Sequence, residues 1–221
     1  MTWLTLNWQQ VLRLLVDHLA LSLPAILLSI IIATPIGWLA HRRRWLGRPL
    51  LGLATLMYAI PALPLLIMIP VVFGFSLRSP QTMVTALTIY GVALLVRTAA
   101  DAFGAVDQAT QESATAVGHS ALSLFWRVNL PLAIPVLVSG IRVMTVSTVG
   151  LVTIGALIGE SGLGLLLTDG FQRGITAEVL TGLLATMALA ALLDGLVHAS
   201  GRALTPWARA AGRPSRQGAT A

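Results

Sequence analysis

The side chains that could support acid–base, nucleophilic or metal chemistry are few and scattered. The 221 residues include 8 Asp and Glu, 4 His and no Cys, so a disulfide and a thiolate metal site are both excluded. The acids and histidines do not stand at the spacings that bind a metal ion. The segment GESGLG at 159–164 superficially resembles a phosphate-binding loop, but it lacks the Gly-Lys-Ser or Gly-Lys-Thr ending. We therefore expect no catalytic residue, no metal site and no bound cofactor in this chain.

A second group of ionisable residues lies inside or beside long apolar runs, where an unpaired charge costs roughly 2.5–3.5 kcal/mol. Arg142 stands within such a run. Its guanidinium could line a water-filled path or pair with an acid on a neighbouring helix, but we favour a structural tie or a side chain that extends toward the inner face of the membrane. Arg97 and Asp101 are four residues apart, as are Asp194 and His198, which places each pair on one helical face. We expect Arg97 to pair with Asp101, and we expect both pairs to serve as structural anchors.

The composition indicates that lipid surrounds most of this chain. It is 56% hydrophobic and 10% charged, with a mean hydropathy of +0.85, whereas a soluble domain is about 25% charged. The net charge of +6 comes from arginines grouped beside apolar runs. That grouping is typical of membrane topology signals and not of a nucleic-acid-binding face.

Five apolar segments are long enough to cross a bilayer, because a helical crossing needs roughly 20 apolar residues. Their predicted limits are 19–40, 50–77, 79–100, 131–159 and 179–199. The second segment contains three prolines and should be kinked. Broken helices are tolerated where they line a cavity, so Tyr58, Pro61 and Pro64 are candidates for the wall of a path through the membrane, although packing is the more ordinary role of Tyr58.

The arginines also predict the direction of the chain. The run HRRR at 41–44 and four arginines between 202 and 216 have no acid nearby, and the positive-inside rule places both groups in the cytoplasm. Five crossings put them on the same side. We therefore expect an external segment at 1–18, a transmembrane domain at 19–199 with a cytoplasmic loop at 101–130, and a cytoplasmic, partly disordered tail at 200–221.

The loop at 101–130 is a polar interruption between apolar runs. Asp107 could cap a short helix that contains Glu112, and Gly118 permits a sharp change of direction. A second helix through Phe125 would lead to the Leu-Pro at 130–131. On physical grounds alone, an ordinary solvated connector and a docking surface for a soluble partner are about equally well supported.

The spacing within this loop resembles the coupling motif of ABC-importer permeases: Glu-Ala-Ala, three residues, Gly, nine residues, Ile, one residue and Leu-Pro. The matching positions are Glu112, Ser113, Ala114, Gly118, Val128, Leu130 and Pro131. Every spacing is kept, with Ser113 in place of Ala and Val128 in place of Ile. The resemblance implies that the helix at 112–118 inserts into a cleft of a separate ATP-binding subunit and passes the closing motion of that subunit to the membrane helices.

From about residue 19 to residue 207 the chain is also similar to the permeases of osmoprotectant importers. The stretches GLVTIGALIGESGLG, GFQRG and LLDGLVHASGRALTPW carry this likeness. It implies an all-α integral membrane protein with five transmembrane helices in the methionine-importer-type permease fold, with the N-terminus outside and the C-terminus inside. The implied location is the bacterial cytoplasmic membrane.

The same resemblance implies the partners and the solute. ATP and Mg²⁺ would be bound by an ATP-binding cassette subunit, solute would arrive on an extracytoplasmic solute-binding protein, and a second permease copy or paralogue would complete the path. The implied solutes are quaternary amines such as glycine betaine, choline or carnitine. A methionine-type amino-acid permease is the alternative. A membrane-embedded enzyme and an ATP-independent channel are rivals from other classes, and the scattered acids and histidines disfavour an enzyme.

Overall fold

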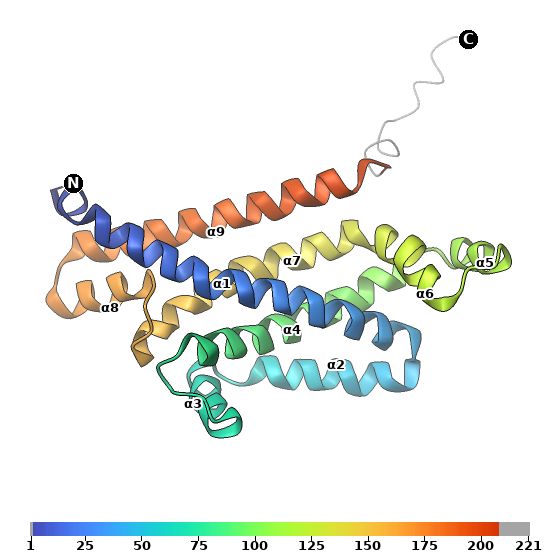
Figure 1. The fold of residues 1–221 in the computed structure, drawn as a ribbon, viewed down its shortest axis with the longest axis horizontal. Helices are drawn as coiled ribbons and strands as arrows, with labels where there is room; N and C mark the ends of the chain where they lie inside the picture. The colour runs from blue at the N-terminus through green and yellow to red at the C-terminus, as the bar shows by residue number, and fades with distance from the viewer. Residues whose placement is uncertain (1, 208–221) are drawn as a thin grey trace, which may run out of the picture.

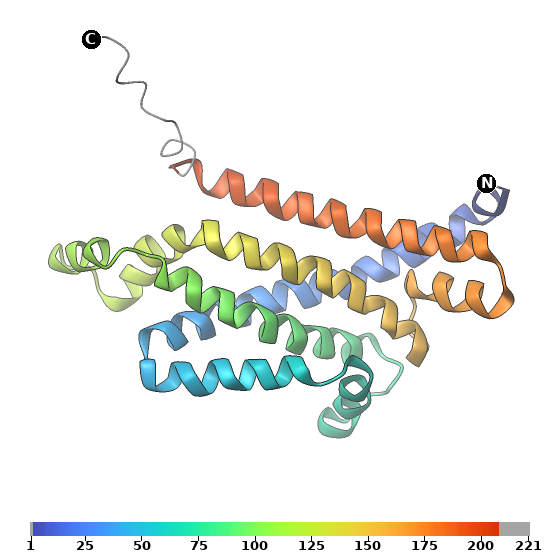
Figure 2. The same cartoon turned by 180° about the vertical axis from the view of Figure 1, so that it is seen from behind.

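A computed structural model describes residues 2–207, and all its regular structure over those residues is helical. The long helices run side by side as an elongated bundle (Figures 1 and 2). Within the described residues, four helices are long and apolar enough to cross a membrane: Trp3–Arg42, Pro80–Gly104, Ala121–Ile158 and Thr176–Leu204. A bent pair, Trp45–Ala59 with Ala62–Phe73, would make a fifth crossing. The predicted fold class is confirmed at this level, as an all-α protein with four or five candidate spans.

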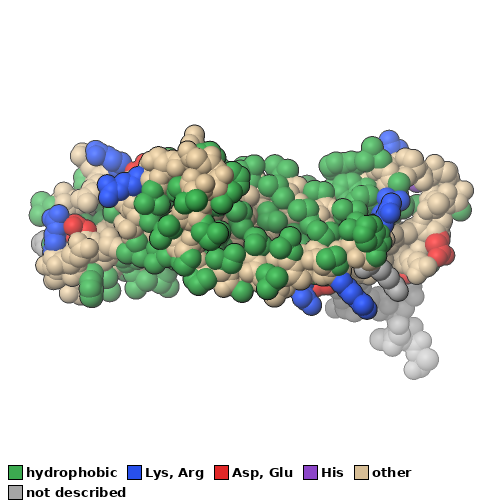
Figure 3. Space-filling view, turned by 90° about the horizontal axis from the view of Figure 1, so that it is seen from below, with side chains coloured by type: hydrophobic (Ala, Val, Ile, Leu, Met, Phe, Trp, Pro, Cys, Tyr) green, Lys and Arg blue, Asp and Glu red, His purple; other side chains and the backbone are tan. Residues whose placement is uncertain are grey.

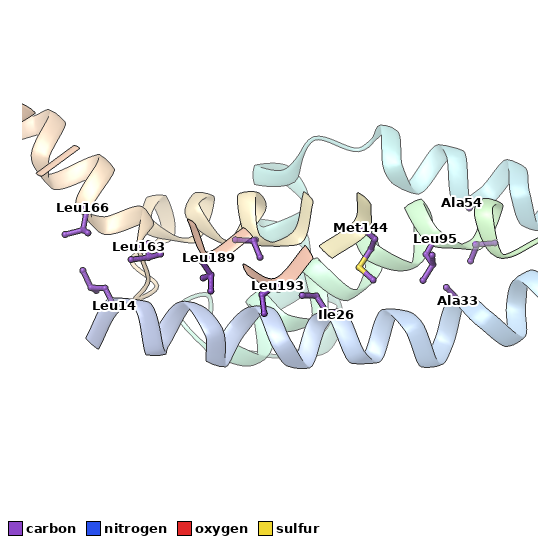
Figure 4. Packing of buried hydrophobic residues seen from close by; sticks show 12 residues of the cluster. Leu14, Ile26, Ala33, Ala54, Leu95, Met144, Leu163, Leu166, Leu189 and Leu193 are labelled. Carbon is purple, nitrogen blue, oxygen red and sulfur yellow. The ribbon is translucent and has the colours of Figure 1, made fainter. Parts of the chain in front are cut away.

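The first helix, α1 (Thr2–Arg42), is longer than a single crossing. Its 41 residues extend about 60 Å, twice the thickness of the hydrocarbon core. Residues 2–18 of the predicted external segment are helical and continue without a break into the first predicted span. Leu14 in this part packs in one cluster with Leu163 and Leu166 at the start of α8 (Gly164–Arg173) (Figure 4). This apolar packing gives the early turns of α1 a tertiary support.

The predicted second span, at 50–77, is two helices and not one kinked rod. α2 (Arg44–Ala59) and α3 (Ala62–Phe73) are bent by 108° at the break between them. Ile60 is extended, with ψ 126°, as sterics require of a residue before proline. Pro61 and Pro64 both lack an N–H, so two helical hydrogen bonds are lost within one turn. This double loss explains why the bend is sharper than an ordinary proline kink.

The remaining membrane-length helices lie where the third, fourth and fifth spans are predicted. They are α4 (Pro80–Gly104), α7 (Leu130–Val152), which continues as the 3₁₀ segment η2 (Thr153–Ile158), and α9 (Thr176–Leu204). α4 packs mainly between α1 and α7, and α7 packs on α9. Gly37 allows the close approach of α1 to α4, because a Cβ there would lie 2.4 Å from the Cβ of Ala99. Met144, Leu189 and Leu193 belong to the same buried cluster as Leu14 and Leu163 (Figure 4).

The two ends of the bundle carry different elements. One end gathers the α1–α2 turn, α5 (Gln108–Ala116) and the last turns of α9, whereas the N-terminus and α8 lie at the other end (Figures 1 and 2). Hydrophobic side chains cover the middle of the face drawn in Figure 3, and arginine side chains stand mainly nearer the ends. This distribution fits a belt of lipid around the middle of the bundle. The predicted disorder of the tail concerns mainly residues 208–221, which lie outside the described residues.

Candidate functional site

The loop that the sequence singles out forms an elbow, defined here as residues 105–131. It consists of α5, the short α6 (Ala121–Leu124) and a π-helical turn, η1 (Phe125–Asn129), which runs directly into α7. Asp107 stands at the N-cap of α5, as predicted, but its carboxylate accepts no backbone N–H. Its Oδ2 instead accepts a hydrogen bond of 3.3 Å from Thr110 Oγ1. The two helices predicted within this loop, one containing Glu112 and one through Phe125, are both present.

Gly118 terminates α5 in a conformation that favours glycine. Its φ is +95°, in the left-handed region that costs other L-residues roughly 1–2 kcal/mol. The Gly118 N–H donates to Thr115 O at 3.0 Å and the His119 N–H donates to Ala114 O at 3.1 Å, the paired bonds of a Schellman ending. No atom lies within 4 Å of a Cβ built at Gly118. The backbone angle, and not lack of space, accounts for the glycine.

The surface of α5 is open along its whole length, and none of its residues is buried. Glu112 and Ser113 are exposed and Ala114 is half-buried. Gln108 Nε2 donates to Glu112 Oε1 at 2.7 Å, and Ser113 Oγ donates to Ala109 O at 2.8 Å. These polar groups are partnered within the helix. The surface of α5 is therefore small, ordered and exposed, and its shape is suited to docking.

Exposed apolar side chains extend this surface beyond α5. Val117 is 84% exposed, Leu122 is 68% exposed and Trp126 is 60% exposed. All three belong to a segment beyond the end of the apolar belt, where such exposure commonly marks a protein interface. Sequence spacing had not pointed to Val117 or Leu122, since neither belongs to the coupling motif.

The second half of the elbow is anchored in the bundle by aromatic packing. Phe125 is 8% exposed, and its ring centroid lies 4.9 Å from that of Trp38 on α1 and 5.8 Å from that of Phe103 on α4. Leu130 packs against the same cluster. The sequence placed Phe125 only on a helix, because its partners are distant in the chain and share no recognisable spacing with it. These contacts fix η1, which joins α6 to α7 without a break, to both α1 and α4.

The remaining motif positions lie at the entry to α7. Val128 and Pro131 are half-buried, and the Leu130 N–H donates to Phe125 O, which closes the π-helical turn. Pro131 occupies the first turn of α7, where its missing N–H is tolerated. The two halves of the motif thus have different environments, since one half is exposed on α5 and the other lies at the entry to α7.

A cavity of ≈ 1080 Å³ separates the elbow from the α1–α2 turn. Arg42 and Arg43 line it from the turn, and Glu112 lines it from α5. Arg42 lies 5.1 Å from the ring centroid of Trp38, a cation–π contact. At the same cavity, Asn129 is buried and its Oδ1 has no hydrogen-bond partner within residues 2–207. The cavity is therefore lined by charged and polar groups from both sides.

The charged residues within the spans are arranged differently from one of our expectations. Arg142 on α7 and Asp194 on α9 form an ion pair at 2.6 Å, so the guanidinium has a counter-charge on a neighbouring helix. The predicted pair of Arg97 with Asp101 was wrong, because no ion pair joins them although both lie in the described part of the chain. Both side chains are exposed on α4, where the solvation of each charge outweighs a weak surface attraction.

The three path-lining candidates meet at the break between α2 and α3. Tyr58 lies in the last turn of α2 with 53% of its surface exposed, and Pro61 and Pro64 produce the bend. Over residues 2–207, no group of three or more Asp, Glu or His could hold a metal ion. The bundle therefore has an exposed helix, α5, at one end and a sharp bend between α2 and α3 along its length.

Comparison with known proteins fits this arrangement. Residues 25–209 match the family described as binding-protein-dependent transport system inner membrane component. The chain belongs to this family. The match contains the whole elbow, the helix break and the Arg142–Asp194 pair, so these features are parts of an inner-membrane component of a transport system.

Relatives of this inner-membrane component are named for osmoprotectant transport. The osmoprotectant import permease protein OsmW of Salmonella typhimurium is 36% identical over 197 residues, which cover 86% of this chain and 89% of the relative. The glycine betaine/carnitine/choline transport system permease protein OpuCD of Bacillus subtilis is 28% identical over 206 residues, 93% of this chain and 89% of the relative.

A solved structure of the MetNI methionine ABC transporter in an inward-facing conformation has a similar fold. One of its chains superimposes with a TM-score of 0.79 at 24% identity and covers 90% of this chain and 98% of its own length. At this identity the likeness shows the fold alone. The inner-membrane component therefore has the methionine-importer-type permease fold that the sequence resemblance implied.

Proposed function

We propose that this chain is the permease subunit of an ATP-driven importer of osmoprotectant quaternary amines such as glycine betaine, choline or carnitine. The observation that carries the proposal is the elbow, in which α5 is fully open while Phe125 fixes the segment behind it to the bundle. An element of this shape transmits motion without performing chemistry. The names of the relatives supply the solute class.

The proposed assembly contains two permease chains, two ATP-binding cassette subunits and an extracytoplasmic solute-binding protein. One ATP-binding subunit, which carries ATP and Mg²⁺, docks on each α5. A second permease copy or a paralogue is required because four or five spans are too few to enclose a gated path. The bacterial cytoplasmic membrane is the proposed location, with the N-terminus and α8 outside and the elbow in the cytoplasm.

The proposed mechanism depends on the continuity of the elbow with α7. Closure of the ATP-binding subunits displaces α5, and the aromatic contacts of Phe125 with Trp38 and Phe103 carry the displacement to α1 and α4. Because packed helices move as rigid bodies, the displacement reaches the helix break near Tyr58 without any change in local structure. The path then opens alternately to the two sides.

Uptake assays in cells that express the complete transporter test this proposal. Labelled glycine betaine, choline and carnitine should accumulate in an ATP-dependent manner, and methionine should not. Preferential uptake of methionine would instead assign the chain to amino-acid import. Accumulation by the purified permease without its ATP-binding subunit would contradict the proposal altogether.

A further inference from the structure

The only two tyrosines in the sequence meet at the break between α2 and α3. The chain has 2 Tyr in 221 residues, and the ring centroids of Tyr58 and Tyr90 lie 6.2 Å apart with the ring planes at 82°. Tyr58 stands in the last turn of α2, whereas Tyr90 lies on α4. Both phenol rings of the protein therefore lie at the sharp bend between α2 and α3, although they come from different helices.

Tyr90 is held in place by the broken backbone itself. The ring is 8% exposed, and its hydroxyl donates a hydrogen bond to Ile60 O. In an unbroken helix that carbonyl would accept from residue 64, but residue 64 is a proline and has no N–H. Tyr90 therefore satisfies a backbone acceptor that the break leaves free, and it presents its ring to Tyr58 from a fixed position.

Tyr58 has no such constraint and faces outward. Its side chain is 53% exposed, among exposed apolar neighbours that include Leu56 at 66% and Ile67 at 56%. Tyr58 stands thirteen positions after Trp45, which lies at the other end of α2. This spacing places it about 20 Å along the helix and within a hydrocarbon core of about 30 Å. Figure 3 shows the apolar side chains of the face to which α2 and α3 belong.

The electrostatic environment of Tyr58 favours brief, weak binding of a cation over tight binding. α2 ends at Ala59, and the carbonyl end of a helix carries a partial negative charge. The face of a phenol ring is also negative and attracts a quaternary ammonium group within about 6 Å. Neither α2 nor α3 contains an acidic residue, so no full negative charge stands on these two helices to trap the cation.

We propose that Tyr58 forms a transient binding site for the quaternary ammonium group of the solute at the narrow part of the path, with Tyr90 as its positioning residue. This site rests on the proposed function, because it requires that the face of α2 and α3 lines the path. In a two-copy assembly each copy contributes one Tyr58. The aromatic face selects trimethylated cations. An ammonium group without methyl groups remains hydrated and gains less binding free energy from the ring.

The test varies the electron density of the ring without changing its shape. Tyr58 is replaced by Phe, and then by phenylalanine analogues with one, two and three fluorine atoms, introduced at the same position by nonsense suppression. Each fluorine weakens the negative face of the ring. The rate of glycine betaine uptake should fall stepwise along the series and be roughly tenfold lower in Tyr58→Leu. Tyr58→Phe alone should retain most of the uptake.

Two controls separate this site from a structural effect. Leu192→Met changes an exposed apolar side chain on α9, away from the face of α2 and α3, and should leave uptake unchanged. Every variant is also checked for co-purification with the ATP-binding subunit, which should be normal. An uptake rate that is equal across the fluorinated series would overturn the site while leaving the proposed function intact. Failure of the wild-type transporter to take up any quaternary amine would overturn the proposed function and the site with it.

Discussion

Arg142 and Asp194 form a two-pronged ion pair between α7 and α9. Arg142 Nε donates to Asp194 Oδ1 at 2.7 Å, and Arg142 Nη2 donates to Asp194 Oδ2 at 2.6 Å. The two parallel bonds fix the orientation of both side chains. Because α7 is the direct continuation of the elbow, the pair joins the element that would receive motion to the last helix of the bundle.

Replacement of Asp194 by Asn should leave Arg142 without a counter-charge in the apolar belt, where an unpaired charge is costly. We expect the thermal unfolding midpoint in detergent to fall by several degrees, and the exchange of charges in Arg142→Asp/Asp194→Arg to restore much of it. Arg173→Gln is the matched control, because it removes an exposed pair with Asp169 at 2.9 Å and should have little effect. Equal decreases of the unfolding midpoint in Asp194→Asn and Arg173→Gln would contradict a stabilising role of the Arg142–Asp194 ion pair.

His18 should be a second determinant of stability, since it joins three elements. The buried ring donates from Nε2 to Val149 O at 3.0 Å and accepts at Nδ1 from the Leu163 N–H at 3.3 Å. His18→Leu leaves both backbone groups without these partners and should cost about 1–3 kcal/mol of unfolding free energy. Denaturant unfolding measures the change. A cost of this size is not expected for Asn7→Leu, which removes one local hydrogen bond to Trp3 O.

Substitutions at Gly118 should follow the backbone angle and not side-chain size. The amount of ATP-binding subunit that co-purifies should be highest with Gly at position 118 and should fall in the order Asn, Ala and Val. Asn tolerates a positive φ better than Ala or a β-branched residue does. Co-purification of the two subunits measures this order. Gly195→Ala serves as control, since Gly195 lies in α9, has no positive φ and has open space around its Cβ position. Normal assembly with Gly118→Val would refute the role of the Schellman ending.

The loop between η2 and α8 should make stability depend on pH. Burial raises the pKa of Glu160, so the folded protein binds this proton more tightly than the unfolded chain does. The resulting stabilisation is complete below the ordinary glutamate range and is lost as the pH rises through the raised pKa. The unfolding midpoint should therefore decrease over that interval in the wild type. Glu160→Gln should flatten this part of the profile, and an unchanged slope would exclude Glu160 as its source.

The sequence predicted the broad architecture because hydrophobic length and proline position are local properties. Apolar runs located α4, α7 and α9, and the spacing from Glu112 to Pro131 located the elbow. The length of α1 was missed because polar residues in its first turns interrupt the apolar run, while the packing that supports those turns comes from α8.

Contacts between distant parts of the chain were not predictable from spacing. Arg97 and Asp101 had the favourable interval of a helical pair, yet the ion pair in the spans joins Arg142 to Asp194, 52 residues away. Phe125 likewise finds its partners on α1 and α4. Such pairings depend on how the helices cross, and a single sequence does not encode crossing angles in any local pattern.

Cross-linking from the elbow to the ATP-binding subunit tests the central claim most directly. The chain contains no Cys, so Thr115→Cys, exposed on α5, and Ser76→Cys, exposed at the other end of the bundle, each carry one unique thiol for a photoactivated cross-linker. In the assembled transporter we expect an adduct with the ATP-binding subunit from residue 115 and none from residue 76. An intact, active complex that gives no adduct from residue 115 would contradict the account.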